Sequence, residues 1–243
     1  MLIRLNKFLA ESDCCSRRKA DEYILAGDVS VNGSVIKELG VKVDEIKDTV
    51  EFKGKPVKPS QNLVYYAVYK PKGVVSTVSD EKGRESVVDL VPHEPRVYPV
   101  GRLDLASEGL MILTNDGELT QKITHPSFEH EKEYEVEVRI MDYELWEDKK
   151  NIGQEIVNKF TSGIIIEGKR MFADKVSVDL IRDSLFLIHL SLHTGYNRQI
   201  RRMCDKIGLI VKKITRTRIG KLRLDSLDLS TGEYKKVSKE NIL

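Results

Sequence analysis

The first sixty residues change from a helical to a strand-like pattern of apolar positions. Apolar side chains recur at helical spacing over residues 2–9, which predicts a short amphipathic helix. A second helix is expected to begin after Ser16, a good N-cap, and to end near Ala26 at Gly27. Residues 29–36 predict a hairpin, because an Asn-Gly pair supplies the positive φ angles of a tight turn.

The rest of the chain combines strand patterns with a few helices. A polar, proline-containing linker at 56–62 precedes strand formers at 64–69. Residues 130–138 alternate, so that Tyr134 and two valines share one face and glutamates occupy the other. Tyr134 therefore points toward a core or a cleft. The other predicted elements are strands at 50–52, 74–77, 110–113, 164–166, 176–181 and 185–190, a turn at 183–184, and helices at 118–124, 142–150 and 200–207.

Composition describes a globular chain, and local charge adds a possible partner. The 243 residues are 40% hydrophobic and 32% charged, with a formal net charge of +2. From Arg198 to Arg223 there are ten cations and one acid, which favours a nucleic-acid contact. Arg17, Arg18 and Lys19 occupy the first turn of a predicted helix, where the dipole disfavours cations. A bound phosphate backbone or a solvated basic turn explains that arrangement equally well.

Cysteine usage and hydropathy exclude several classes of protein. The three cysteines, Cys14, Cys15 and Cys204, form neither a disulfide framework nor a zinc-binding spacing, and Cys204 fits a core position. The five histidines also lack metal-ligand spacing, so no metal site is expected. No signal-peptide pattern and no apolar run of about 18 residues is present, which predicts a cytoplasmic protein without a membrane segment.

One acid in residues 99–117 is the main candidate for chemistry. Asp104 follows Arg102 and lies between Gly101 and Gly109, ahead of an apolar strand and an Asp-Gly turn. Glycines beside a strand indicate tight bends or a close approach of another molecule. An acid in such a loop serves as nucleophile, general base, metal ligand or turn cap, and by itself Asp104 is most simply a turn cap. Asp116, the competing acid, is explained by turn or cap duty.

The N-terminal segment resembles the ribosomal protein S4-type RNA-binding domain. The resemblance rests on residues 4–10, 15–21 and 27–33, which combine a helix, a basic helix and a Val-Asn-Gly hairpin. It implies that the basic helix and the hairpin face structured RNA.

Four blocks in the remaining chain resemble the RsuA/RluB/RluE/RluF group of RNA pseudouridine synthases. They are Lys70–Gly73, residues 101–117, residues 130–134 and residues 197–203. Ser107 is a departure, since the group often has threonine there, but the hydroxyl is kept. The resemblance implies an α+β fold: a small S4-type domain at 1–60 and a catalytic domain at 61–243 with a mixed, largely antiparallel sheet and a central cleft.

The resemblance also implies the reaction and the site. Asp104 corresponds to the catalytic carboxylate, Arg201 to its basic partner and Tyr134 to the tyrosine that packs against the target base. Ile200 is the candidate apolar lid on a flipped-out uracil. RNA contacts are expected from Arg102, Arg198 and Arg202, and from the first turn of the basic helix. The implied activity converts uridine to pseudouridine in ribosomal RNA, with 23S rRNA as the first candidate, by a monomer without a cofactor.

Three alternatives remain open at this point. The same mechanism can act on 16S rRNA or tRNA. A non-catalytic RNA-binding or ribosome-assembly factor would use both basic helices without needing Asp104, Tyr134 and Arg201 together. A glycosidase-like enzyme on RNA would require a second acid to protonate the leaving group.

Overall fold

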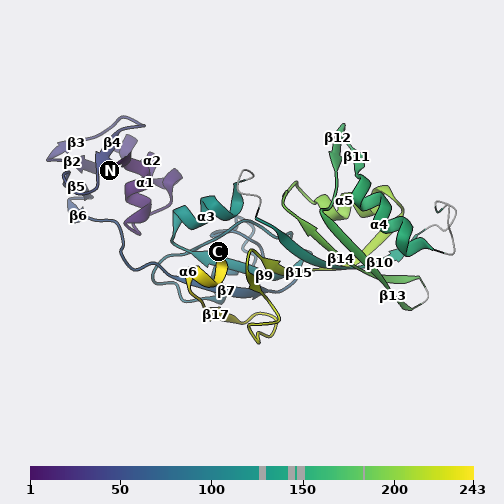
Figure 1. Ribbon diagram of the computed structural model, residues 1–243. Helices are drawn as coiled ribbons and strands as arrows, with labels where there is room; N and C mark the ends of the chain where they lie inside the picture. The colour runs from purple at the N-terminus through teal and green to yellow at the C-terminus, as the bar shows by residue number, and fades with distance from the viewer. Residues whose placement is uncertain (126–129, 142–145, 147–150, 183) are drawn as a thin grey trace. The chain divides into compact units, whose positions relative to one another are not determined.

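Two compact units make up the protein. The structure, a computed structural model, describes residues 1–125, 130–141, 146, 151–182 and 184–243. Unit 1 comprises Met1–Val64 with Glu94–Arg96 and Asn115–Gly117, and unit 2 comprises the rest of the chain. Figure 1 traces the chain through both units.

Unit 1 builds its own core from two helices and two small sheets. Its helices bury Leu5, Phe8, Leu9 and Ile24 against strand valines. β1 pairs with β4, and the second sheet has the strand order β3-β2-β5-β6. The elements are β1 (Leu2–Arg4), α1 (Leu5–Glu11), α2 (Arg17–Ala26), β2 (Val29–Val31), β3 (Ser34–Val35), β4 (Lys42–Asp44), β5 (Val50–Phe52) and β6 (Lys55–Val57).

The capped helix and the Asn-Gly hairpin of unit 1 are confirmed. Ser16 Oγ accepts a hydrogen bond from the Lys19 N–H, and Gly27 ends α2 at φ +83°. Two expectations are wrong. Residues 2–4 form a strand rather than the start of a helix, because they pair with the distant β4. The expected linker begins as β6, an edge strand where Pro56 loses no essential N–H.

From residue 65 onward, the described chain forms one large sheet, a separate two-stranded sheet of β11 and β12, and helices. A 3-10 helix, η1 (Val87–Leu90), precedes β8 and the loop that carries Asp104. The strands are β7 (Tyr65–Lys70), β8 (Tyr98–Pro99), β9 (Glu108–Thr114), β10 (Lys132–Ile140), β11 (Ile164–Ile166), β12 (Lys169–Met171), β13 (Lys175–Arg182), β14 (Leu185–Leu192), β15 (Leu209–Ile219), β16 (Leu222–Arg223) and β17 (Tyr234–Lys236). The α-helices are α3 (Gly117–Thr124), α4 (Ile152–Ser162), α5 (Gln199–Lys206) and α6 (Lys239–Ile242).

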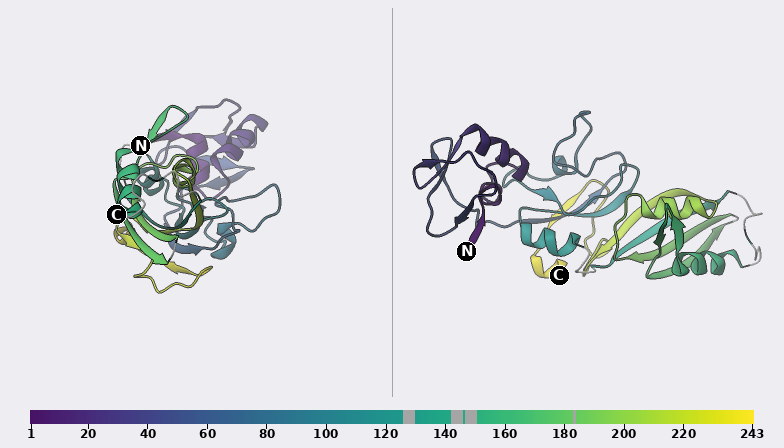
Figure 2. Two further views of the ribbon diagram at one scale, coloured as in Figure 1. Left: turned by 90° about the vertical axis from the view of Figure 1, so that its right-hand side faces the viewer. Right: turned by 90° about the horizontal axis from the view of Figure 1, so that it is seen from above.

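The large sheet is mixed and mainly antiparallel, as predicted. Its order is β13-β14-β10-β15-β9-β7-β17, with β8 on β9 and β16 on β15. The pairing of β15 with β9 is parallel, and the other pairings are antiparallel. Helices α4 and α5 pack against one face of its β13–β15 half, where they share a core with Val136, Ile188 and Ile214 (Figures 1 and 2). An α+β fold is therefore confirmed.

Several predicted elements differ in detail. Helix α4 was not expected, although Ile152, Ile156 and Phe160 carry the helical spacing that buries it. The strand expected at 74–77 is reduced to a single bridge between Val75 and Ser86. The helix expected at 142–150 lies outside the described residues apart from the buried Trp146, and the turn at 183–184 does so in part. No described helix has the length and hydropathy to cross a membrane.

Candidate active site

One pocket of unit 2 brings together three side chains from different elements. Asp104 comes from the loop between β8 and β9, Tyr134 from β10 and Arg201 from α5, and all three line the pocket. Tyr134 also packs against the core beneath α4 and α5, so it is anchored as well as accessible. The alternating pattern of β10 predicted that Tyr134 points toward a core or a cleft. In the structure its side chain does both, because it packs against the core and lines the pocket.

The loop that carries Asp104 is held through its backbone. Each backbone carbonyl of residues 103–107 accepts a hydrogen bond. The loop is therefore held in one conformation, and the Asp104 carboxylate is in position before a ligand binds. The carbonyl oxygens of Leu103, Asp104, Leu105, Ala106 and Ser107 accept, in that order, from Ser76 Oγ (2.8 Å), the Ser107 N–H (3.0 Å), the Gly73 N–H (2.8 Å), Arg201 Nη2 (2.8 Å) and Lys70 Nζ (2.8 Å).

Arg201 contacts both the loop and the carboxylate. Its Nη2 donates to the Ala106 carbonyl and to Ser107 Oγ at 3.2 Å. Its Nε lies 3.8 Å from Asp104 Oδ2 and is buried without a hydrogen-bond partner. Burial lowers the pKa of Arg201, and the charge of Asp104 opposes that shift. The pair is thus an ion pair at long range, which leaves the Asp104 oxygens accessible from the pocket.

Lys70 holds the loop that carries Asp104, a role that the sequence did not reveal. It is fully buried, and its ammonium donates to the carbonyls of Pro71 and Ser107. Burial, followed by the nearby Arg216 charge, lowers its pKa to about 8. In the sequence, the Lys70–Gly73 block indicated a turn and one of the four family blocks, but no role for the Lys70 side chain. The one available signal was its position at the end of an apolar strand. A lysine there can be buried when backbone carbonyls accept hydrogen bonds from its ammonium group.

Gly109 lets two strands meet beneath the loop. A Cβ on this residue would lie 2.4 Å from both the backbone nitrogen and the backbone oxygen of Arg216, and φ is +116°. Arg216 itself is buried, and its Nε donates to the Leu110 carbonyl at 2.8 Å. The sequence had indicated a tight bend or the close approach of another molecule. The structure shows a positive φ and a close approach by β15 of the same chain.

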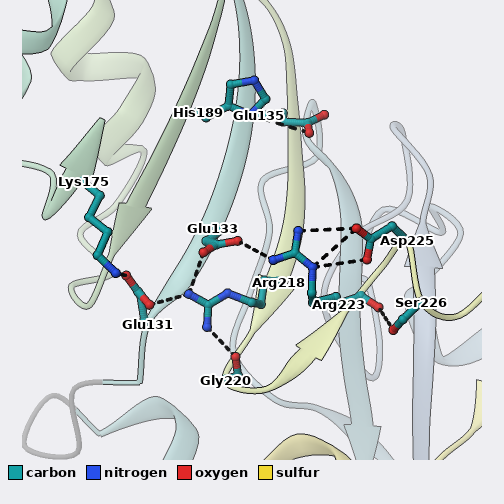
Figure 3. A network of polar contacts seen from close by, with 10 residues as sticks. All are labelled: Glu131, Glu133, Glu135, Lys175, His189, Arg218, Gly220, Arg223, Asp225 and Ser226. Atoms are coloured by element: carbon teal, nitrogen blue, oxygen red, sulfur yellow. Dashed lines mark hydrogen bonds and ion pairs between the residues drawn. The ribbon is translucent and has the colours of Figure 1, made fainter. Parts of the chain in front are cut away.

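The strand that bears Tyr134 is braced on its other face by an ion-pair network (Figure 3). Arg218 of β15 contacts both Glu131 and Glu133, the latter at 2.7 Å. Lys175 of β13 adds a contact to Glu131 at 3.2 Å, and Arg223 of β16 adds one to Glu133, also at 3.2 Å. The network joins Glu131 and Glu133, which precede Tyr134 in sequence, to cations of β13, β15 and β16, so it holds the start of β10.

The Glu131→Gln variant is expected to be less stable than the wild type at pH 7, by a deficit that is smaller at pH 3. The hydrogen bond from Arg218 is the first cause that lowers the pKa of Glu131 from 4.5 to about 2. The stabilisation from this carboxylate is therefore complete above about pH 4.5 and is lost as the pH falls toward 2. We expect a deficit of about 1–2 kcal/mol at pH 7, since the pair is partly solvated.

The measurement is the free energy of unfolding in urea at pH 7 and pH 3. Glu137→Gln, on the same strand face, is the matched control and should change the free energy of unfolding by less than about 0.5 kcal/mol. A deficit for Glu131→Gln that stays constant between the two pH values would contradict the proposed origin of the effect.

The basic run from Arg198 to Arg223 does not form one solvated patch, and that expectation needs correction. Arg216 is buried. Lys213 pairs with Glu108 at 2.9 Å, while Arg218 and Arg223 join the network on the outer face of the sheet. Acids distant in sequence neutralise these cations, because strand pairing brings β10 beside β15. Charge counted along the sequence therefore overstated the basic surface.

The other predicted contact residues are divided between the pocket and its surroundings. Arg102 and Arg198 are exposed and line the pocket, and Ile200 lines it while only 6% exposed. Arg202 does not line this pocket and instead lies 2.6 Å from Glu167, in the turn between β11 and β12. In unit 1, the first-turn residues of α2, Arg17, Arg18 and Lys19, are exposed.

Titratable groups elsewhere offer little alternative chemistry. Among the residues that the structure describes, no group of three or more His, Cys, Asp and Glu side chains is arranged to hold a metal ion. Cys204 is buried in the core, as predicted, and burial raises the pKa of its thiol to about 12. The charged and aromatic side chains that line the pocket are one carboxylate, two tyrosines and three guanidinium groups.

Comparison with known proteins agrees with this arrangement. Residues 64–206 match the RNA pseudouridylate synthase family, and residues 3–50 match the S4 domain. The chain is 38% identical to the dual-specificity RNA pseudouridine synthase RluF of Escherichia coli K12, over 99% of this chain and 77% of that protein. It is also 38% identical to ribosomal large subunit pseudouridine synthase B of Bacillus subtilis, over 98% of this chain and 93% of that protein.

Solved structures include a similar protein. A crystal structure of a pseudouridylate synthase, 25% identical, covers 99% of this chain and 98% of its own with a TM-score of 0.63. Together with the sequence matches, this similarity extends over both units and over the strands and loops that build the pocket. The chain belongs to the RNA pseudouridine synthase family and carries an S4 domain at its N-terminus.

Proposed function

We propose that this enzyme isomerises a specific uridine of ribosomal RNA, with Asp104 as the catalytic carboxylate. The observation that carries the proposal is the convergence of Asp104, Tyr134 and Arg201 on one pocket whose loop is fixed by five backbone hydrogen bonds. The two relatives named above include a large-subunit ribosomal RNA enzyme, which makes 23S rRNA the first substrate to test. We also propose that the enzyme is a cytoplasmic monomer, in accordance with this substrate.

The reaction is balanced without an added reactant. The bond between N1 of uracil and C1′ of ribose breaks, the base turns, and a bond forms between C5 and C1′. The proton on C5 leaves and a proton is taken up at N1. Asp104 acts on the ribose, on the base ring or as the proton acceptor, and all three roles require an ionised carboxylate that faces the flipped nucleotide.

The other pocket residues receive roles from their positions. Tyr134 packs against the flipped base, and Ile200 covers it from the apolar side of α5. Arg201 holds the loop through the Ala106 carbonyl and faces Asp104 with its Nε, so it orients the carboxylate in the pocket. Arg102, Arg198 and Arg202 serve as contacts to the RNA backbone.

A division of labour between the two domains completes the proposal. Residues 1–60 would act as the RNA-docking domain, and residues 61–243 as the catalytic domain. Support for docking comes from α2, whose first turn has three exposed cations and no acid. The N-cap, Ser16, is a neutral residue whose hydroxyl accepts a hydrogen bond from the Lys19 N–H. It therefore supplies no negative charge to balance the three cations at this end of the helix.

Incubation of the protein with transcribed 23S rRNA, 16S rRNA and tRNA tests the substrate. Pseudouridine is mapped chemically in each RNA, without added metal or cofactor. Modification at one site in 23S rRNA is the expected result. Selective modification of 16S rRNA or tRNA would contradict the proposed substrate but support the proposed reaction. RNA binding without any pseudouridine would favour the non-catalytic alternative.

Neutralising the first turn of α2 is expected to weaken RNA binding and to flatten its salt dependence. Each lost phosphate contact reduces the slope of log K against log salt by about 0.7–0.9. The Arg17→Gln, Arg18→Gln, Lys19→Gln triple variant should therefore lose about 2 units of slope. Fluorescence anisotropy at several salt concentrations measures it.

A control with the same change in charge isolates the position of the cations. Lys42, Lys47 and Lys55 are exposed cations of the same unit, outside α2. Changing these three to Gln should leave most of the slope intact. Equal losses in the two triple variants would show that net charge, rather than α2, determines binding.

A further inference from the structure

An exposed tyrosine at the rim of the pocket has no role in the function proposed so far. Tyr196 lies in the loop between β14 and α5 and lines the same pocket as Asp104 and Tyr134. It nevertheless remains 44% exposed. A large aromatic side chain kept open beside a binding pocket is available to a ligand that extends beyond that pocket.

The loop that presents Tyr196 is built around a buried amide. Gln199 is 4% exposed, and its Oε1 accepts from Thr194 Oγ1 at 3.0 Å and from the Tyr196 N–H at 3.3 Å. Its Nε2 donates to the Phe172 carbonyl at 3.2 Å, and its own N–H donates to the Tyr196 carbonyl at 3.1 Å. The backbone of Tyr196 is therefore fixed on both sides, so the ring is presented at low entropic cost.

One cation lies over this ring, and a second lines the same pocket. Lys169, on the β11–β12 hairpin that lies beside α5 in Figure 1, places its Nζ 5.8 Å from the centre of the Tyr196 ring. Arg198 follows two residues later, at φ +50°, and also lines the pocket. An exposed ring flanked by cations is the combination that binds single-stranded nucleic acid, since the ring stacks on a base and the cations contact phosphates.

We propose that Tyr196 is a stacking platform for the base next to the target uridine, with Lys169 contacting the adjoining phosphate. The proposal rests on the proposed function, because it takes RNA as the substrate of the Asp104 pocket. When the target uridine leaves its stack, one face of the neighbouring base loses its partner. Stacking on Tyr196 replaces that partner at the pocket rim, and the platform thereby selects RNA whose flanking nucleotide can be unpaired.

The test uses a substrate RNA that carries 2-aminopurine on the 5′ or the 3′ side of the target uridine. Its fluorescence is quenched when the base stacks on an aromatic ring. Binding is measured with the full-length Asp104→Asn protein and with Tyr196→Ala and Tyr196→Phe added to it. Turnover is measured separately, with the Tyr196 variants in the active enzyme.

We expect quenching at one of the two positions, lost in Tyr196→Ala and kept in Tyr196→Phe. Loss of one stacked base should raise KM by roughly 5- to 100-fold, with kcat changed by less than about 3-fold. Tyr234→Ala is the matched control, because Tyr234 is 42% exposed in β17 and does not line the pocket. It should leave the quenching and KM as in the wild type.

Two outcomes would overturn the platform. One is Tyr196→Ala with unchanged quenching and KM. The other is Tyr196→Phe with a loss as large as that of Tyr196→Ala, which would assign the effect to the hydroxyl group. Failure of the proposed function looks different, since the wild-type enzyme would then make no pseudouridine in an RNA that it still binds and quenches.

Discussion

Replacing Asp104 with asparagine is expected to abolish pseudouridine formation while the protein still folds and binds RNA. Asparagine keeps the shape of the side chain but removes the charge that faces Arg201 Nε across 3.8 Å. None of the three possible roles of Asp104 can be performed by an amide, so turnover should fall by at least about 10³-fold. Pseudouridine mapping in 23S rRNA measures turnover, and anisotropy measures binding.

The loop itself should survive this substitution. Its five backbone carbonyls are held by donors from other residues and from the Ser107 N–H, and the Asp104 side chain contributes none of these bonds. Asp205→Asn is the matched control: Asp205 is an exposed acid of α5, four residues after Arg201. It should leave turnover within about 3-fold of wild type. Wild-type turnover by Asp104→Asn would refute the catalytic assignment.

Gly109→Ala is expected to be the most destabilising single-methyl change in the sheet. The new Cβ would meet the Arg216 backbone at 2.4 Å, and backbone atoms inside a sheet cannot move aside as a flexible side chain does. The positive φ of +116° adds a conformational cost of about 1–2 kcal/mol for a residue with a Cβ. We expect a total loss of more than about 4 kcal/mol, or failure to fold.

Thermal unfolding measures this loss, with a second glycine as the control. Gly232 also has a positive φ, +93°, but a Cβ there would meet nothing within 4 Å. Gly232→Ala should therefore cost only the conformational part, about 1–2 kcal/mol. A similar decrease in Tm for the two variants would show that β9 and β15 can separate without penalty and would contradict the close packing described above.

The sequence predicted local features well because their causes are local. Ser16 and Gly27 delimit α2 by capping chemistry, and alternation placed Tyr134 on the face of β10 that reaches the core and the pocket. The strand at β1 was missed because its partner, β4, lies about forty residues away. A pairing of that kind leaves no periodic signal in a three-residue segment.

The candidate site shows the same division. Asp104, Tyr134 and Arg201 were proposed from motif blocks, and the structure places their side chains around one pocket. Lys70 and Gln199 belong to those blocks but received no role of their own, because their roles depend on burial: both side chains end inside the protein and bond to backbone and loop groups. A lysine or a glutamine in a sequence is most often exposed, so nothing in the local pattern distinguished these two.

The basic segment after Arg198 demonstrates why charge patterns need a fold. Ten cations with one acid indicated a continuous RNA surface. Strand pairing instead places Arg218 beside Glu131 and Glu133, and it buries Arg216 beneath the loop that carries Asp104. The exposed cations at the pocket are fewer: Arg102 and Arg198 line it, and Lys169 lies 5.8 Å from the centre of the Tyr196 ring.

By itself, the sequence determined the family, the α+β class and the residues able to carry the chemistry, since these depend on local order and residue type. Only the tertiary structure decided which cations are used internally, how the Asp104 loop is held and where an aromatic ring stays open at the pocket. Those properties arise from contacts between segments far apart in the chain, such as β7 and α5 with the loop at 103–107. Their energies depend on burial and distance, which no linear pattern encodes.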